Sequence, residues 1–143
     1  MIRTKKSLGQ NFLIDDKILE KIVDITEIAN NTILEIGPGS GNLTSYILKK
    51  NPKKIYVVEK DDILANNLNK NFKNQLIIIN EDILKIDEKS ISKESLIVFG
   101  NLPYNISTEI LSKWIINLQD TFWFDYLILM FQKEVADRII AKF

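Results

Sequence analysis

The chain has 143 residues, of which 45% are hydrophobic and 27% charged, and its formal net charge at pH 7 is zero. This composition suits one globular domain with a sizeable core, and no apolar run approaches the ~20 residues of a membrane-spanning helix. The sequence holds no cysteine and no histidine, which excludes disulfides, thiolate zinc sites, cysteine nucleophiles and histidine acid–base chemistry. The neutral charge also counts modestly against a nucleic-acid partner.

Apolar residues recur along the chain at spacings typical of helices and of strands. The first predicted helix is amphipathic, and its expected N-cap is Asp15 or Asp16. In chain order, the predicted elements are helix 15–28, strand 32–36, helix 42–50, strand 54–58, helix 63–72, strand 76–79, strand 96–99, helix 108–118, strand 126–130 and helix 133–142. Strands that alternate with helices indicate βαβ units, so we predict an open, doubly wound α/β fold with a mostly parallel sheet.

Three predicted strands end in residues that suit a nucleoside. Gly37, Gly39 and Gly41 follow the first strand and open a helix, where a ligand can approach the backbone closely. Glu59 ends the second strand and can accept from both hydroxyls of a ribose, and Asp82 after the third can accept from an adenine amine. Taken singly, each glycine could simply form a turn and each acid could simply lie on the surface. Because all of these residues follow the ends of three successive strands, they favour a site for S-adenosylmethionine over one for NAD.

The most informative motif is Asn101-Leu102-Pro103-Tyr104, which lies just after the fourth predicted strand. The carboxyl end of a strand is where open α/β sheets bind ligands. The motif combines an amide that accepts hydrogen bonds, a proline that stiffens the turn and an aromatic ring that can stack on a flat ligand. It therefore indicates a site for the exocyclic amine of a nucleobase.

With these residues placed, the chain resembles the ribosomal RNA adenine N6-dimethyltransferases of the small-subunit (16S) branch, known for kasugamycin sensitivity. The resemblance rests on four segments: residues 6–13 (KSLGQNFL), 35–44 (EIGPGSGNLT), 101–108 (NLPYNIST) and 132–138 (QKEVADR). Leu102 and the Pro38 pattern distinguish it from the 23S rRNA methyltransferases of macrolide resistance, which remain the alternative. The resemblance implies a Rossmann-like class I methyltransferase fold.

Family members continue past the last of these segments into further strands and a helical domain that grips RNA. We therefore expect residues 1–143 to be an incomplete S-adenosylmethionine-binding catalytic domain, truncated before the last strands and without the C-terminal RNA-binding domain. An apolar fifth strand at the edge of the sheet agrees with this expectation.

The resemblance also implies roles for individual residues. Asn11 and Leu13 would close over the methionine end of the cofactor, Gly37 would line it, and Asn101 would hold the transferring end. Glu59 would hold the ribose and Asp82 the adenine. The full set of expected cofactor-binding residues is Gln10, Asn11, Leu13, Gly37, Gly39, Gly41, Glu59, Asp82 and Asn101.

The expected catalytic residues are Asn101, Leu102, Pro103 and Tyr104. The side-chain oxygen of Asn101 and the backbone carbonyl of Leu102 would accept from the two hydrogens of adenine N6, which directs the nitrogen lone pair toward the methyl group. Pro103 would fix the turn and Tyr104 would stack on the base, an interaction worth about 1–3 kcal/mol. Positioning and electrostatics would carry the rate, so neither a general base nor a metal is expected.

The function implied is dimethylation of two adjacent adenosines near the 3′ end of 16S rRNA, in the cytoplasm, by a protein that is a monomer when full length. A non-catalytic small-subunit assembly factor and an NAD-dependent Rossmann protein remain alternatives. Phe12 could anchor the N-terminal arm or line the base pocket. Trp114 and Trp123 are predicted to pack in the core or at its edge rather than stack on bases.

Overall fold

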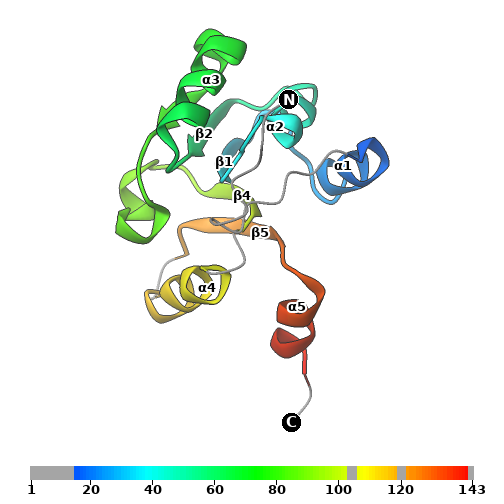
Figure 1. The fold of residues 1–143 in the computed structure, drawn as a ribbon, viewed down its shortest axis with the longest axis vertical. Coiled ribbons are helices and arrows are strands. Elements are labelled where there is room, and N and C mark those ends of the chain that lie inside the picture. Colours follow the sequence, from blue (N-terminus) through cyan, green and yellow to red (C-terminus); the bar gives the residue numbers. More distant parts are fainter. Residues whose placement is uncertain (1–14, 103–105, 119–121, 142–143) are drawn as a thin grey trace.

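The computed structural model describes residues 15–102, 106–118 and 122–141 of the chain. It contains one parallel sheet of five strands in the order β3-β2-β1-β4-β5, which confirms the predicted doubly wound α/β fold (Figure 1). The strands are β1 Thr32–Ile36, β2 Lys54–Val58, β3 Ile77–Ile79, β4 Leu96–Asn101 and β5 Phe124–Met130. The order reverses between β1 and β4, so the crevice favoured for ligands lies at their carboxyl ends.

Helices cover both faces of this sheet (Figure 1). On one face lie α1 Asp16–Val23, α2 Asn42–Leu48 and α3 Asp62–Phe72, and on the other lies α4 Ser107–Ile116. Helix α5, Lys133–Ile139, follows β5. The short 3-10 helices are η2 Lys73–Gln75, η3 Ile83–Lys85 and η4 Glu88–Ser90. No helix in the described part of the chain is long and apolar enough to cross a membrane.

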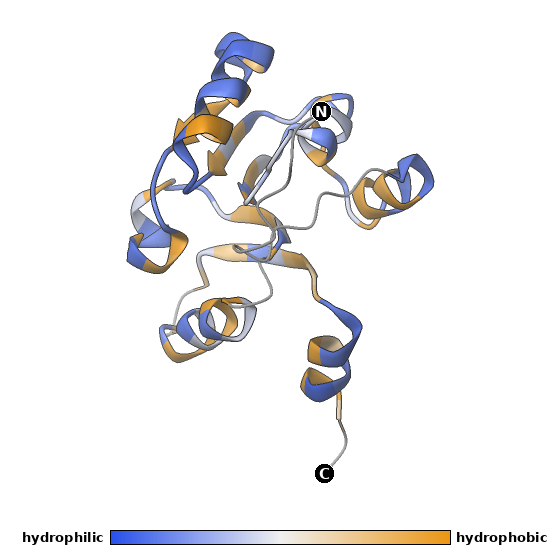
Figure 2. Cartoon of the chain, in the orientation of Figure 1, coloured by the Kyte–Doolittle hydropathy of each residue, from blue (hydrophilic) through white to orange (hydrophobic). Residues whose placement is uncertain are grey.

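Side chains that alternate along the strands build two cores. In β1 every residue is buried, with Ile33 packed toward α1 and α2 and Leu34 packed toward α4. In the second core, the rings of Trp114 and Trp123 meet edge to face with centroids 5.5 Å apart. Both tryptophans are buried, which confirms that they pack in the core. Figure 2 shows β5 coloured largely as hydrophobic, as expected for a strand next to this core.

Aspartates cap the N-termini of two of the α-helices. Asp15 accepts hydrogen bonds from the backbone N–H groups of Lys17 and Ile18, which identifies it, rather than Asp16, as the N-cap of α1. Asp61 caps α3 in the same way. These side chains satisfy backbone donors that have no partner inside the helix.

Several predicted boundaries differ from the structure, by one to three residues in α2, α3, β3, α4, β5 and α5, and the ends of α1 and β4 bear on the argument. Helix α1 ends at Val23 instead of residue 28, because the chain turns at Asp24 and Ile28 reaches the core from the connection to β1. Strand β4 continues past the apolar run through Gly100 to Asn101, because β5 provides hydrogen-bonding partners as far as Met130. Asn101 is therefore the last residue of the strand and not part of the loop that follows it.

Candidate active site

The loops after β1 and β4 lie side by side at the carboxyl edge of the sheet. In the register, Ile36 lies opposite Gly100, so the residues that follow, Gly37 and Asn101, come next to each other. A Cβ atom added to Gly37 would lie 3.5 Å from the backbone oxygen of Asn101. The glycine loop and the Asn101 motif therefore meet at the switch point of the sheet.

The three predicted loop glycines all have positive φ angles: 64° at Gly37, 59° at Gly39 and 88° at Gly41. Gly41 is also the N-cap of α2, and a Cβ atom there would lie 2.5 Å from Cε2 of Phe72. This loop conformation thus needs glycine both for its backbone angles and for the approach of α3.

Replacing Gly41 by alanine should lower the free energy of unfolding by about 3 kcal/mol, because a strained φ angle and an overpacked contact add together. Denaturant unfolding measures this loss, with Ser40→Ala in the same loop as the control, since Ser40 is exposed. In a Phe72→Ala background the substitution should cost less, because the clash with the Phe72 ring is removed, while the strained φ angle and a close approach of 3.2 Å to Cδ2 of Leu68 remain. A loss below about 1 kcal/mol in the parent chain would contradict the steric argument.

Glu59 is buried directly after β2, as the sequence predicts, and its two carboxylate oxygens point to different backbone donors. Oε2 accepts from the N–H of Gly39 at 3.2 Å, and Oε1 accepts from the N–H of Asp61 at 3.0 Å. Burial raises the pKa of Glu59, and these two hydrogen bonds oppose the rise. The structure thus brings this carboxylate against the glycine loop, where both oxygens lie at the edge of the candidate site.

Asp82 follows β3 and caps η3 by accepting from the N–H of Leu84 at 3.0 Å. Its Oδ2 lies 3.3 Å from Nζ of Lys60, a partner that the sequence did not point to. The hydrogen bond from Leu84, helped by Lys60, holds the pKa of Asp82 below its usual range. The side chain of Asn80 joins the same edge by donating to the carbonyl oxygen of Glu59 at 2.9 Å.

Sequence reasoning assigned no role to Glu35, although the structure buries it completely beneath the glycine loop. Its carboxylate in β1 accepts a hydrogen bond of 2.6 Å from the hydroxyl of Thr44 in α2. Burial raises the pKa of Glu35 from 4.5 to about 7, with a smaller contribution from the charge of Glu59. The sequence did contain a sign of this role, because Glu35 is a charged residue within an otherwise apolar strand.

Because the pKa of Glu35 is higher in the folded chain than in the unfolded one, its contribution to stability is fully present below about pH 4.5 and is lost as pH rises to about 7. The loss amounts to about 3 kcal/mol at about 1.4 kcal/mol per pH unit. In Glu35→Gln, this part of the pH dependence should disappear. Urea unfolding between pH 5 and 8 tests this, with exposed Glu27→Gln as control. Parallel curves for parent and Glu35→Gln would disprove it.

Five predicted site residues lie outside the described residues: Gln10, Asn11, Leu13, Pro103 and Tyr104. Phe12 lies outside them as well. Of the remaining catalytic candidates, Asn101 is half-buried at the end of β4 and Leu102 is buried in the core beside α4. The structure thus brings Gly37, Asn101 and Glu59 to one edge of the sheet, and Lys60 links Asp82 to it.

Comparisons with known proteins agree with this geometry. A family model described as ribosomal RNA adenine dimethylase matches residues 1–143. The chain is 69% identical over 142 residues to ribosomal RNA small subunit methyltransferase A of Pelagibacter ubique (strain HTCC1062), covering 99% of this chain and 54% of that protein. It is 46% identical over 146 residues to the protein of the same name from Ehrlichia ruminantium (strain Gardel), and the match covers 99% of this chain and 55% of that protein. The chain thus spans about half the length of these relatives.

Solved structures share the fold. A dimethyladenosine transferase from Plasmodium falciparum superposes with a TM-score of 0.73 at 30% identity, covering 92% of this chain and 47% of that one. The 23S rRNA methyltransferase ErmE gives a TM-score of 0.69 at 24% identity, and the match covers 89% of this chain and 50% of that one. At this identity the match shows a shared fold only. These matches confirm the predicted Rossmann-like class I methyltransferase fold. Because the family model spans the whole chain, the chain belongs to the ribosomal RNA adenine dimethylase family.

Proposed function

We propose that residues 1–143 form an S-adenosylmethionine-binding catalytic domain whose protein dimethylates N6 of two adjacent adenosines near the 3′ end of 16S rRNA, in the cytoplasm. The observation that carries the proposal is that Gly37 and Asn101 lie side by side at the ends of paired strands, because this brings the cofactor loop to the residue expected to hold the reacting amine. Family membership and the name of the relatives, ribosomal RNA small subunit methyltransferase A, support the same substrate class.

The residues present fit S-adenosylmethionine. The three glycines of the loop let a ligand approach the backbone, and the acids Glu59 and Asp82 at successive strand ends suit a ribose and an adenine amine. When bound, S-adenosylmethionine supplies an electrophilic methyl group on a sulfonium. We propose that Gly37, Gly39, Gly41, Glu59, Asp82 and Asn101 hold it, together with Gln10, Asn11 and Leu13.

The protein's part in the reaction is to orient the acceptor amine. The lone pair of adenine N6 is delocalised into the ring, so the amine is a weak nucleophile. The side-chain oxygen of Asn101 and the carbonyl oxygen of Leu102 would each accept a hydrogen bond from one N–H of this amine. These two hydrogen bonds would favour a tetrahedral nitrogen. Pro103 would hold the turn, and Tyr104 would stack on the base. No proton needs to leave before methyl transfer, which suits a chain without histidine.

Titration calorimetry with S-adenosylmethionine tests the cofactor, and NAD is the control ligand. Selective binding of S-adenosylmethionine is the expected result, and binding of NAD alone would overturn the proposal. Methyl transfer to small ribosomal subunits that lack the modification tests the substrate, with large subunits as the control. Methylation of large subunits alone would favour the 23S alternative.

A small-subunit assembly role is the second candidate, and the family's substrate class allows both roles in one protein. An Asn101→Ala variant that still binds small subunits but does not methylate them would separate the two roles.

A further inference from the structure

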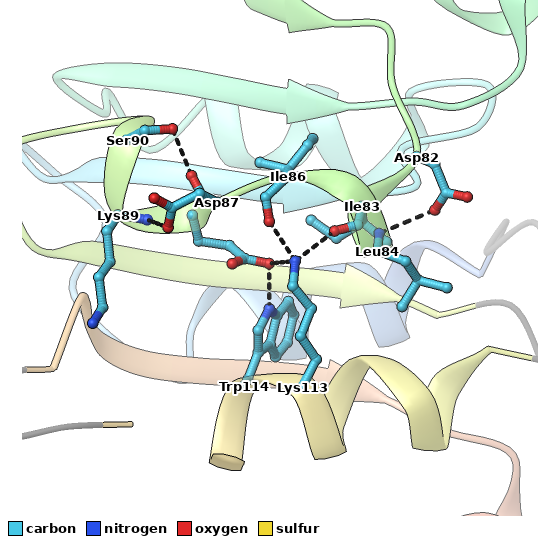
Figure 3. Close-up of polar contacts among 10 residues, drawn as sticks. Asp82, Ile83, Leu84, Ile86, Asp87, Lys89, Ser90, Lys113 and Trp114 are labelled. Carbon is cyan, nitrogen blue, oxygen red and sulfur yellow. Dashed lines mark hydrogen bonds and ion pairs between the residues drawn. The ribbon is translucent and has the colours of Figure 1, made fainter. Parts of the chain in front are cut away.

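A buried polar network joins α4 to the segment that follows β3 (Figure 3). Nζ of Lys113 donates to the carbonyl oxygen of Ile83 at 2.9 Å, to Oε1 of Glu88 at 2.8 Å and to the carbonyl oxygen of Ile86. The same Oε1 accepts from Nε1 of Trp114 at 2.7 Å. A lysine ammonium has three donors, so all three are used here.

This network is too well buried to be an ordinary surface ion pair. The side chains of Glu88 and Lys113 are 7% and 20% exposed, and Trp114 is 1% exposed. Removing one partner of such a pair leaves an uncompensated charge in a poorly hydrated place, which is far more costly than the loss of an exposed pair. The segment that carries Glu88 is therefore held firmly to α4.

The network also reaches the candidate cofactor site. Ile83, whose carbonyl oxygen Lys113 holds, directly follows Asp82, and Asp82 itself caps η3. Figure 3 shows the ammonium of Lys113 against the backbone of this segment at Ile83 and Ile86, with Asp82 at the far end of the segment. At its other end, α4 follows the Asn101 motif along the chain. The network thus ties the segment that carries the expected adenine acceptor to the helix that comes after the expected catalytic motif in the sequence.

We propose that Lys113 is a positioning residue that sets the place of Asp82 for the adenine of the cofactor, with Glu88 and Trp114 fixing its ammonium. The proposal rests on the proposed function, because it takes Asp82 as the adenine acceptor. Lys113 acts through the peptide of Ile83 and does not itself touch the cofactor. If Lys113 only stabilised the fold, its replacement would lower the stability of the chain, and its effect on cofactor affinity would not depend on Asp82.

A double-mutant cycle on the 143-residue chain separates these two roles. Lys113→Met should raise the Kd for S-adenosylmethionine about ten-fold in the parent chain but less than about two-fold in an Asp82→Asn background, because the loss passes through Asp82. Combined with Glu59→Gln, the same substitution should keep its full effect. Lys113→Arg, which retains the donors, should restore most of the affinity. Lys89→Met is the matched control, because Lys89 is exposed on the same segment.

If Lys113→Met does not fold, the pair Lys113→Met with Glu88→Gln replaces it, since this pair leaves no unbalanced charge and still removes the donor to Ile83. An equal rise in Kd in the parent and Asp82→Asn backgrounds would overturn the positioning role, as would an unchanged Kd. Failure of the parent chain to bind S-adenosylmethionine would instead overturn the proposed function, and this proposal with it.

Discussion

Replacing Asn101 by alanine should lower the turnover number for methyl transfer by about 100- to 1000-fold and change the Kd for S-adenosylmethionine by less than about three-fold. The side-chain oxygen of Asn101 would be needed most when the amine develops positive charge, which happens only in the transition state. The position suits this role, because Asn101 ends β4 and its backbone lies beside Gly37.

Methyl incorporation into unmodified small subunits gives the turnover number, and calorimetry gives the Kd. Asn66→Ala is the control, since Asn66 is exposed on α3 and alanine is compatible with a helix. Equal losses in turnover and in cofactor affinity would show that Asn101 binds the cofactor without a special role in the chemical step.

Replacing Glu59 by glutamine should raise the Kd for S-adenosylmethionine about 50-fold, because on the proposed role the charged carboxylate that would accept from the ribose hydroxyls is replaced by a neutral amide. The change is nearly isosteric, but the amide oxygen can accept from only one of the two backbone N–H groups, and the NH2 group then faces the other. The stability of the chain should therefore fall by about 1–3 kcal/mol, the cost of a buried donor without an acceptor, and calorimetry on the folded chain measures the loss of affinity separately. Glu27→Gln, at an exposed position, is the control.

The pH dependence of cofactor affinity adds a second test of Glu59. Because burial raises the pKa of Glu59, its carboxylate becomes protonated at a higher pH than an exposed glutamate does. The affinity of the parent chain should therefore fall on acidification, while that of Glu59→Gln should change little from this cause. The same fall in both chains would assign the pH dependence to another group, such as Glu35.

Local sequence patterns predicted most of the strands closely. The bounds of β1 and β2 agree with the prediction, because buried parallel strands appear as short apolar runs between polar residues. The end of β4 could not be predicted in this way. Gly100 and Asn101 belong to the strand only because β5 pairs with them, and no periodicity within β4 records that partner.

The sequence alone therefore determined the α/β class, the glycine loop and the placement of Glu59, Asp82 and Asn101 at strand ends, since each follows from a local pattern and from the geometry of parallel sheets. Only the tertiary structure decided which side chains from other segments contact the residues at these strand ends. The ion pair between Lys60 and Asp82 joins different parts of the chain. The same holds for the Lys113 network and the buried bond from Thr44 to Glu35. Such contacts depend on how helices pack on the sheet, and the spacing of residues along one element carries no information about them.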